Sequence, residues 1–105
     1  ARNGVVTFSD HMNAYHELME RVVDHAYTAP ADLADDVAVL VYLAKEVGAN
    51  RPAGVDAAEF DKGFKAMEAS VAALRTAVRA GDAAAIAAAR KALKPPYSRL
   101  FAKFG

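Results

Sequence analysis

Six apolar residues in the second half of the chain recur at alternating spacings of four and three, and this repeat constrains the fold more than any other feature. They are Phe60, Phe64, Met67, Val71, Leu74 and Val78. The repeat places all six side chains on one face of a single helix that packs lengthwise in a bundle. Asp56 and Glu59 have the spacing of a capping box, and Gly81 suits a left-handed C-cap. The sequence therefore predicts one continuous helix at about 56–81.

The same rhythm near the N-terminus predicts a helix at about 8–27. Its members are Phe8, Met12, Tyr15, Met19, Val22 and Ala26. Thr7 with Asp10, or Ser9 itself, can cap the start of this helix. Pro30 closes the region, because proline cannot continue the hydrogen-bond ladder of a helix.

A second helix is expected at about 31–47, with Gly48 at its end. Its broad apolar face comprises Leu33, Val37, Leu40, Val41, Ala44 and Val47. Val39, Tyr42 and Leu43 widen that face beyond what one packing surface needs. We therefore expect contacts from two sides, with part of these three side chains buried in a homodimer interface.

The remaining segments of the chain complete the predicted fold. Residues 49–55 form an irregular connection, and Asp82 caps an alanine-rich helix from about 83. Pro95 and Pro96 interrupt that helix, because an interior proline costs ~3 kcal/mol. Residues 95–104 then form a short terminal helix. We predict an all-α fold, with a single domain at 1–105 that forms an antiparallel four-helix bundle with a proline break near the C-terminus.

Composition narrows the chemistry that the chain can perform. The 105 residues include no cysteine, which excludes disulfides, iron–sulfur clusters, thiolate zinc sites and a cysteine nucleophile. The 13 basic and 13 acidic residues cancel, so net charge gives no indication of nucleic-acid binding. No apolar run reaches the ~18–20 residues that span a bilayer. The sequence contains none of the common phosphate-loop, nucleophile-elbow or zinc-protease motifs, so we expect a protein that is not an enzyme.

Methionine and histidine on the first predicted helix allow two interpretations. Met12, His16 and Met19 share one helical face. Thioether and imidazole groups suit Cu(I), and His11 or Met67 can supply a fourth ligand. The alternative is that both methionines of the helix are core residues, since methionine commonly fills gaps in cores, and that the imidazole lies beside the core. The sequence leaves both possibilities open.

The C-terminal segment 90–105 is basic and contains no acid. Its cations are Arg90, Lys91, Lys94, Arg99 and Lys103. One interpretation is an anionic partner. The other is that these are solvated side chains near helix ends, where the helix dipole favours positive charge.

Residues 60–105 resemble the class II cytochrome c family, which comprises cytochrome c prime and cytochrome c556. The resemblance rests on Phe60 and Phe64 early in a helix and on the alanine-rich helix that follows a turn. That turn is Arg79-Ala80-Gly81-Asp82, and the matching basic-aromatic tail is Arg99-Leu100-Phe101-Ala102-Lys103-Phe104.

The chain departs from this family at the haem. The family carries C-x-x-C-H on its fourth helix, which attaches haem covalently and supplies the axial histidine. The nearest counterpart is the run Lys94-Pro95-Pro96-Tyr97-Ser98, which has no thiol and no imidazole. The resemblance therefore implies a relative without covalent haem, located in the periplasm after loss of a signal peptide, and a homodimer through the first two helices. We expect either such a bundle, with copper bound at the first helix, or an interaction bundle that dimerises and holds no cofactor.

Overall fold

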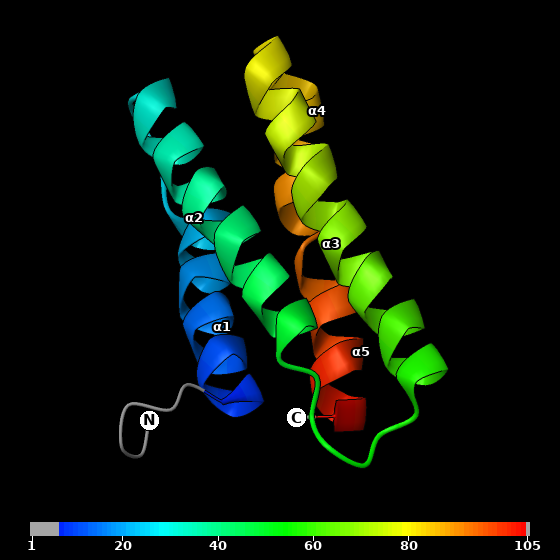
Figure 1. The fold of residues 1–105 in the computed structure, drawn as a ribbon. Coiled ribbons are helices and arrows are strands. Elements are labelled where there is room, and N and C mark those ends of the chain that lie inside the picture. Colours follow the sequence, from blue (N-terminus) through cyan, green and yellow to red (C-terminus); the bar gives the residue numbers. More distant parts are fainter. Residues whose placement is uncertain (1–6, 105) are drawn as a thin grey trace.

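The computed structural model describes residues 7–104, and every regular element in that range is an α-helix (Figure 1). The helices are α1 (Phe8–Asp24), α2 (Pro30–Ala49), α3 (Ala57–Ala80), α4 (Ala83–Lys91) and α5 (Lys94–Phe104). The predicted all-α class is confirmed, and the helices pack as a bundle.

The longest helix, α3, is the centre of the packing. It contacts α2, α4 and α5, while α1 packs on α2. Figure 1 shows α2 and α3 in front, with α1 behind α2 and with α4 and α5 behind α3. The buried side chains of the described residues are all hydrophobic, and nearly all of them join in one cluster.

The start of α1 agrees with the prediction, and its end does not. The Thr7 hydroxyl accepts a hydrogen bond from the backbone N–H of Asp10 at 3.2 Å, and the Asp10 carboxylate accepts one from the N–H of Thr7 at 2.9 Å. This is a complete capping box. The helix stops at Asp24 and does not reach residue 27, so Ala26 is exposed and does not extend the apolar face.

A cation from the far end of the chain satisfies the last carbonyl groups of α1. The guanidinium of Arg90, on α4, donates to the backbone oxygens of Val22 and Val23 at 2.6 and 3.3 Å, and also to that of His25. Positive charge is favourable at this end because the helix dipole is negative there. These carbonyl groups therefore have partners without a further helical turn.

The prediction that Gly48 ends α2 is wrong, because the helix continues through Ala49. A Cβ atom at position 48 would overlap the ring of Phe64 on α3. Glycine at this position therefore allows the ring to lie against the backbone of α2. At the other end of the helix, Pro30 occupies the first turn, where its missing N–H is not needed.

The caps of α3 are partly as predicted. Asp56 accepts a hydrogen bond from the backbone N–H of Ala58 at 2.9 Å, and Gly81 adopts the left-handed conformation with φ of 68°. Glu59 does not complete the expected capping box, because its carboxylate accepts a bond from Lys103 of α5 at 2.8 Å.

Two residues, Ala92 and Leu93, lie between α4 and α5, immediately before the segment with the two prolines. The side chain of Leu93 is fully buried. The α4 helix itself buries no residue, which agrees with its small side chains. Both prolines fall in the first turn of α5, where the missing N–H groups do not interrupt a ladder.

We expect Gly48→Ala to destabilise the protein by about 1–3 kcal/mol, because the added methyl group overpacks the contact with Phe64. Alanine at an unconstrained helix position would act in the opposite direction, by up to ~1 kcal/mol. Urea unfolding measures the change. A second substitution, Phe64→Leu, should recover part of the loss, and a Gly48→Ala protein as stable as wild type would contradict the proposed contact.

Candidate interaction surface

The structure separates the predicted metal ligands of α1. The side chains of Met12 and Met19 are buried in the core, as is that of Met67. The side chain of His16 is 46% exposed, and its Nε2 lies 3.2 Å from Oε1 of Glu20. His11 is half-buried in the first turns of the helix. The methionines therefore lie where the alternative interpretation of the sequence placed them, as core residues.

No group of three or more His, Cys, Asp or Glu side chains within residues 7–104 is arranged to hold a metal ion. A thioether of α1 would have to leave the core to join His16 at a copper ion. Removing such a side chain from the core costs about 1.5–3 kcal/mol.

We therefore expect Cu(I) competition against a chelator to give the same result for wild type, His16→Ala and the double variant Met12→Leu/Met19→Leu. The leucines preserve the core, because exchange of Met for Leu nearly conserves volume. Tighter Cu(I) binding by wild type than by both variants would establish the copper site instead.

The counterpart of the haem-attachment run contributes Tyr97 to an aromatic stack. The ring of Tyr97 lies parallel to Tyr15 at 5.6 Å, to His16 at 5.3 Å and to Phe101 at 6.0 Å, measured between centroids. Tyr15 is fully buried, whereas Phe101 is 48% exposed. The stack thus runs from the core to the surface along the contact of α1 with α5.

The hydroxyl of Tyr15 is buried without a hydrogen-bond partner among the described residues. Burial raises the pKa of Tyr15 well above its ordinary value, and Ser70 offsets only part of this shift. The Ser70 hydroxyl donates to the backbone oxygen of Met67 at 2.6 Å, and it does not form a bond of good geometry with the phenol.

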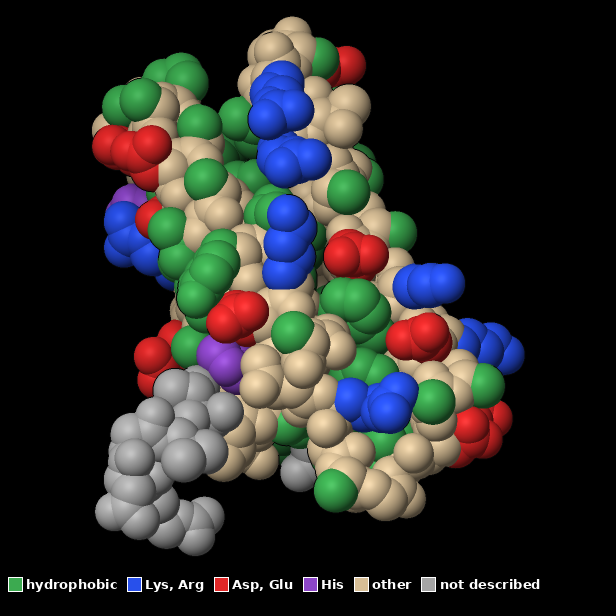
Figure 2. All heavy atoms as spheres, in the orientation of Figure 1, with side chains coloured by type: hydrophobic (Ala, Val, Ile, Leu, Met, Phe, Trp, Pro, Cys, Tyr) green, Lys and Arg blue, Asp and Glu red, His purple; other side chains and the backbone are tan. Residues whose placement is uncertain are grey.

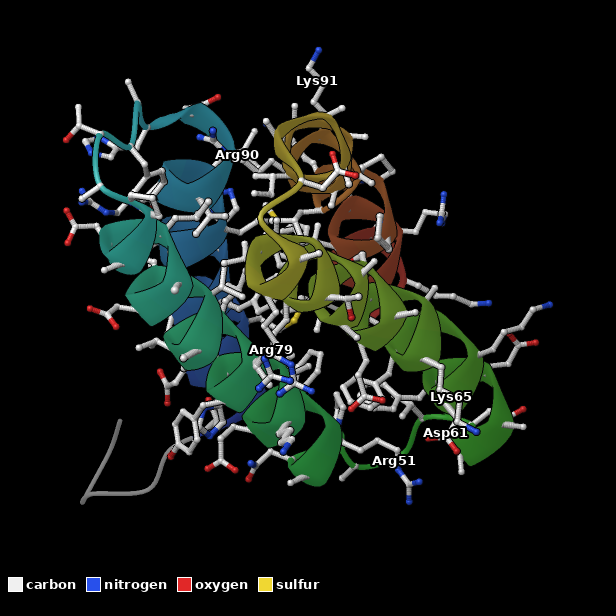
Figure 3. All side chains as sticks on the ribbon, turned by 90° about the horizontal axis from the view of Figure 1, so that it is seen from above. Arg51, Asp61, Lys65, Arg79, Arg90 and Lys91 are labelled. Carbon is white, nitrogen blue, oxygen red and sulfur yellow. The ribbon has the colours of Figure 1, made fainter. Side chains whose placement is uncertain are left out.

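Several cations of the basic C-terminal segment have partners within the molecule. Arg90, labelled in Figure 3, binds the end of α1. Its guanidinium also lies 5.4 Å from the centre of the Tyr27 ring. Lys94 pairs with Glu20 at 3.1 Å. Lys103 pairs with the carboxylate at the start of α3. Sequence reasoning missed the role of Arg90, because more than sixty residues separate it from the carbonyl groups it binds.

Tyr27 and Asp36 link the α1–α2 turn to α2. The phenol of Tyr27 donates to the Asp36 carboxylate at 2.6 Å, and Arg21 Nε donates to the same oxygen at 2.9 Å. These bonds hold the pKa of Asp36 below its ordinary value. Burial, with the bond to the carboxylate, raises the pKa of Tyr27 to about 12.

We expect the stability of the protein to fall in acid partly through Asp36. Its folded pKa lies below its unfolded value, so its contribution is present above about pH 4 and is lost as pH falls through the lowered pKa. Asp36→Asn should therefore lower stability at pH 7 and reduce the slope of stability against pH in acid. Urea unfolding from pH 7 to pH 2.5 measures both. Asp61→Asn, at an exposed position that takes part in no ion pair within residues 7–104, is the control, and equal behaviour of the two variants would contradict the assignment.

The outer face of α2 carries exposed apolar side chains. Val39 is 50% exposed and Tyr42 is 58% exposed. Leu43, predicted to share this surface, instead packs partly buried against the core. Asp35 and Glu46 flank the two exposed residues, since all four positions fall on one side of the helix. We refer to Asp35, Val39, Tyr42 and Glu46 as the outer ridge.

Beside the outer ridge, two adjoining hollows form a groove between α2 and α3. Their volumes are about 270 Å³ and about 110 Å³, and Arg75 lines both. The apolar lining consists of Ala34, Val37, Ala38, Val41, Ala44, Ala69, Val71, Ala72 and Val78. The charged lining consists of Lys45, Lys65, Glu68, Arg75 and Arg79. We refer to this surface as the α2–α3 groove.

Positive side chains dominate the rim of the α2–α3 groove. Figure 2 shows Lys and Arg side chains in a line over the junction of the two helices, and Figure 3 shows Arg79 between them. Within residues 7–104, none of the four cations of the groove forms an ion pair. The sequence pattern did not reveal this surface, because its cations come from two helices and flank the predicted apolar faces.

Charge is also unequal between the two halves of the bundle. Residues 7–50, which include α1 and α2, contain eight carboxylates and two Lys or Arg side chains, a formal charge of −6. Residues 56–104, which include α3, α4 and α5, contain five carboxylates and nine cations, a formal charge of +4. The neutral composition of the chain therefore conceals an acidic half and a basic half.

The chain matches no protein-family model, and no curated protein or solved structure matches it significantly. The resemblance to class II cytochromes c stays a prediction that rests on the residues quoted for it. Within residues 7–104, no helix is both long enough and apolar enough to cross a membrane.

Proposed function

We propose that this protein is a non-enzymatic helical bundle that acts by self-association, pairing with a second copy through the outer ridge of α2. The observation that carries the proposal is the exposure of Val39 and Tyr42, at 50% and 58%, one turn apart on one helix. Large apolar side chains grouped on a surface favour association, because each loses contact with water in an interface.

The fold that supports this role is an antiparallel four-helix bundle in which α4 and α5 together form the fourth helix. We attribute the break between them, at Ala92 and Leu93, to Pro95 and Pro96, which follow it in the first turn of α5. In this arrangement the outer ridge remains on the surface, since α2 packs against both α1 and α3 with its other faces.

We also propose that the chain is a haem-less relative of the class II cytochromes c and acts in the periplasm. Support comes from the residues of the resemblance and from the aromatic packing of Tyr97, which lies in the run that corresponds to the haem-attachment motif. The ring of Tyr97 packs at the edge of the core, and Ser98 stands at the position of the family's axial histidine. Copper at His16 is the rival hypothesis, and the Cu(I) competition above decides it.

We expect sedimentation equilibrium to show a dimer for wild type and a weaker dimer for Val39→Ser/Tyr42→Ser, because the variant removes the apolar contacts from the interface. A loss of at least about tenfold in dimer affinity corresponds to ~1.4 kcal/mol. Phe101→Ser is the matched control, since that residue is the third large exposed apolar side chain among residues 7–104 and lies on α5. A wild-type protein that stays monomeric at millimolar concentration would refute the proposal.

A further inference from the structure

We propose that the α2–α3 groove is the receptor for the outer ridge of a second copy, so that two molecules bind each other reciprocally. This inference rests on the self-association proposed above and adds the surface that receives α2. The two surfaces adjoin along α2, which supplies the whole ridge and one wall of the groove, and an isologous two-fold interface needs two complementary surfaces that lie side by side.

Charge complementarity is the first argument. The groove presents Lys45, Lys65, Arg75 and Arg79 against the single carboxylate of Glu68. The outer ridge presents the carboxylates of Asp35 and Glu46. Neither ridge carboxylate is in an ion pair within residues 7–104, and there the carboxylate of Glu46 accepts a hydrogen bond only from the exposed Tyr42 hydroxyl, at 3.3 Å. Cations and carboxylates left without partners in one molecule can thus pair between two.

The spacing of the charges is the second argument. Asp35 and Glu46 lie eleven positions apart on α2, which is about 16 Å along a helix. Lys65 lies ten positions from Arg75 and fourteen from Arg79, which is about 15 and 21 Å along α3. The two ends of the ridge therefore match the two ends of the groove.

Two-fold symmetry assigns the pairs. The smaller hollow brings Ala34 and Ala38 level with Arg75 and Arg79, whereas the larger one brings Lys45 level with Lys65. An axis that crosses α2 near its middle places the second α2 antiparallel to the first. The C-terminal carboxylate of the incoming ridge, Glu46, then faces the two arginines. The N-terminal one, Asp35, faces the two lysines.

The apolar surfaces are complementary in the same arrangement. The middle of the incoming ridge consists of Val39 and Tyr42, which are large and exposed. The middle of the groove is lined by small side chains, including Ala69, Ala72 and Val41. Small residues on the receiving helices permit the close approach that an additional helix needs. Large side chains of the ridge therefore meet a hollow of the groove.

A second copy fits this groove better than an amphiphile with one anionic headgroup. The cations extend over about 21 Å of α3, so one carboxylate or phosphate group cannot reach them all. A helix with carboxylates at both ends of an apolar face can reach all of these cations, and α2, with its outer ridge, is such a helix.

Charge reversal on each surface tests the inference. In R75E/R79E the Glu46 carboxylate of the incoming ridge meets two carboxylates, and in E46K a cation at position 46 meets the two arginines. We expect each variant alone to lose at least about a hundredfold in dimer affinity, since like charges at an interface cost several kcal/mol. An equimolar mixture should form a 1:1 heterodimer, because position 46 of each ridge then meets charges of opposite sign at positions 75 and 79, and Asp35 of each ridge still meets the two lysines. Sedimentation and native mass spectrometry measure both results.

The control variant is K91E/R99E, which reverses two exposed cations outside the groove and should dimerise like wild type. Circular dichroism and thermal melting verify that every variant is folded. If R75E/R79E dimerises like wild type, or if the two reversed variants do not pair, the groove is not the receptor although self-association stands. If wild type is itself monomeric, self-association fails, and the reversed variants are not needed to show it. Binding of laurate or of an acidic helical peptide by monomeric wild type, lost in R75E/R79E, would assign the groove to another occupant and overturn the inference.

Discussion

The apolar face of α3 is the constraint on which the other helices depend. Phe60, Met67, Val71 and Leu74 are buried on it, and α2, α4 and α5 all contact this helix. Burial of each large side chain contributes about 1.5–3 kcal/mol, so the face supplies much of the free energy that holds the bundle together. Because residue 48 has no side chain, the backbone of α2 can lie against the ring of Phe64 on this helix. The position of α2, and with it the orientation of the outer ridge, therefore follows from packing on α3.

The core also determines what chemistry α1 can offer. Met12 and Met19 fill the interior beside Tyr15, and His16 lies outside, stacked on Tyr97. The ring of His16 is stacked on Tyr97 and bonded to Glu20, so contacts within the bundle fix its position. The same contacts that make α1 a stable helix of the bundle therefore keep its soft ligands apart.

Patterns within short segments of the sequence predicted several structural features that depend on residues within a few positions of one another. These are the apolar repeat, the helix near the prolines, and the caps at Thr7, Asp56 and Gly81. The end of α1 was not predicted, because Arg90 satisfies its carbonyl groups from the far end of the chain. The prediction that Gly48 ends α2 was wrong for a related reason, because the residue that requires glycine there, Phe64, lies on another helix. The sequence did not predict the α2–α3 groove, because its cations and its hollows come from two helices and leave no pattern within one segment.

The opposition of an acidic half and a basic half gives the molecule a strong electric dipole although its net charge is zero. Two such molecules exert torques on each other before they touch, and each turns until unlike halves face. Antiparallel dipoles side by side attract, so the proposed symmetric pair is one of the orientations that this interaction favours. Salt shortens the range of this effect to about 8 Å at physiological ionic strength, which leaves encounter rates sensitive to the medium. Overall neutrality is thus compatible with directed encounters between copies.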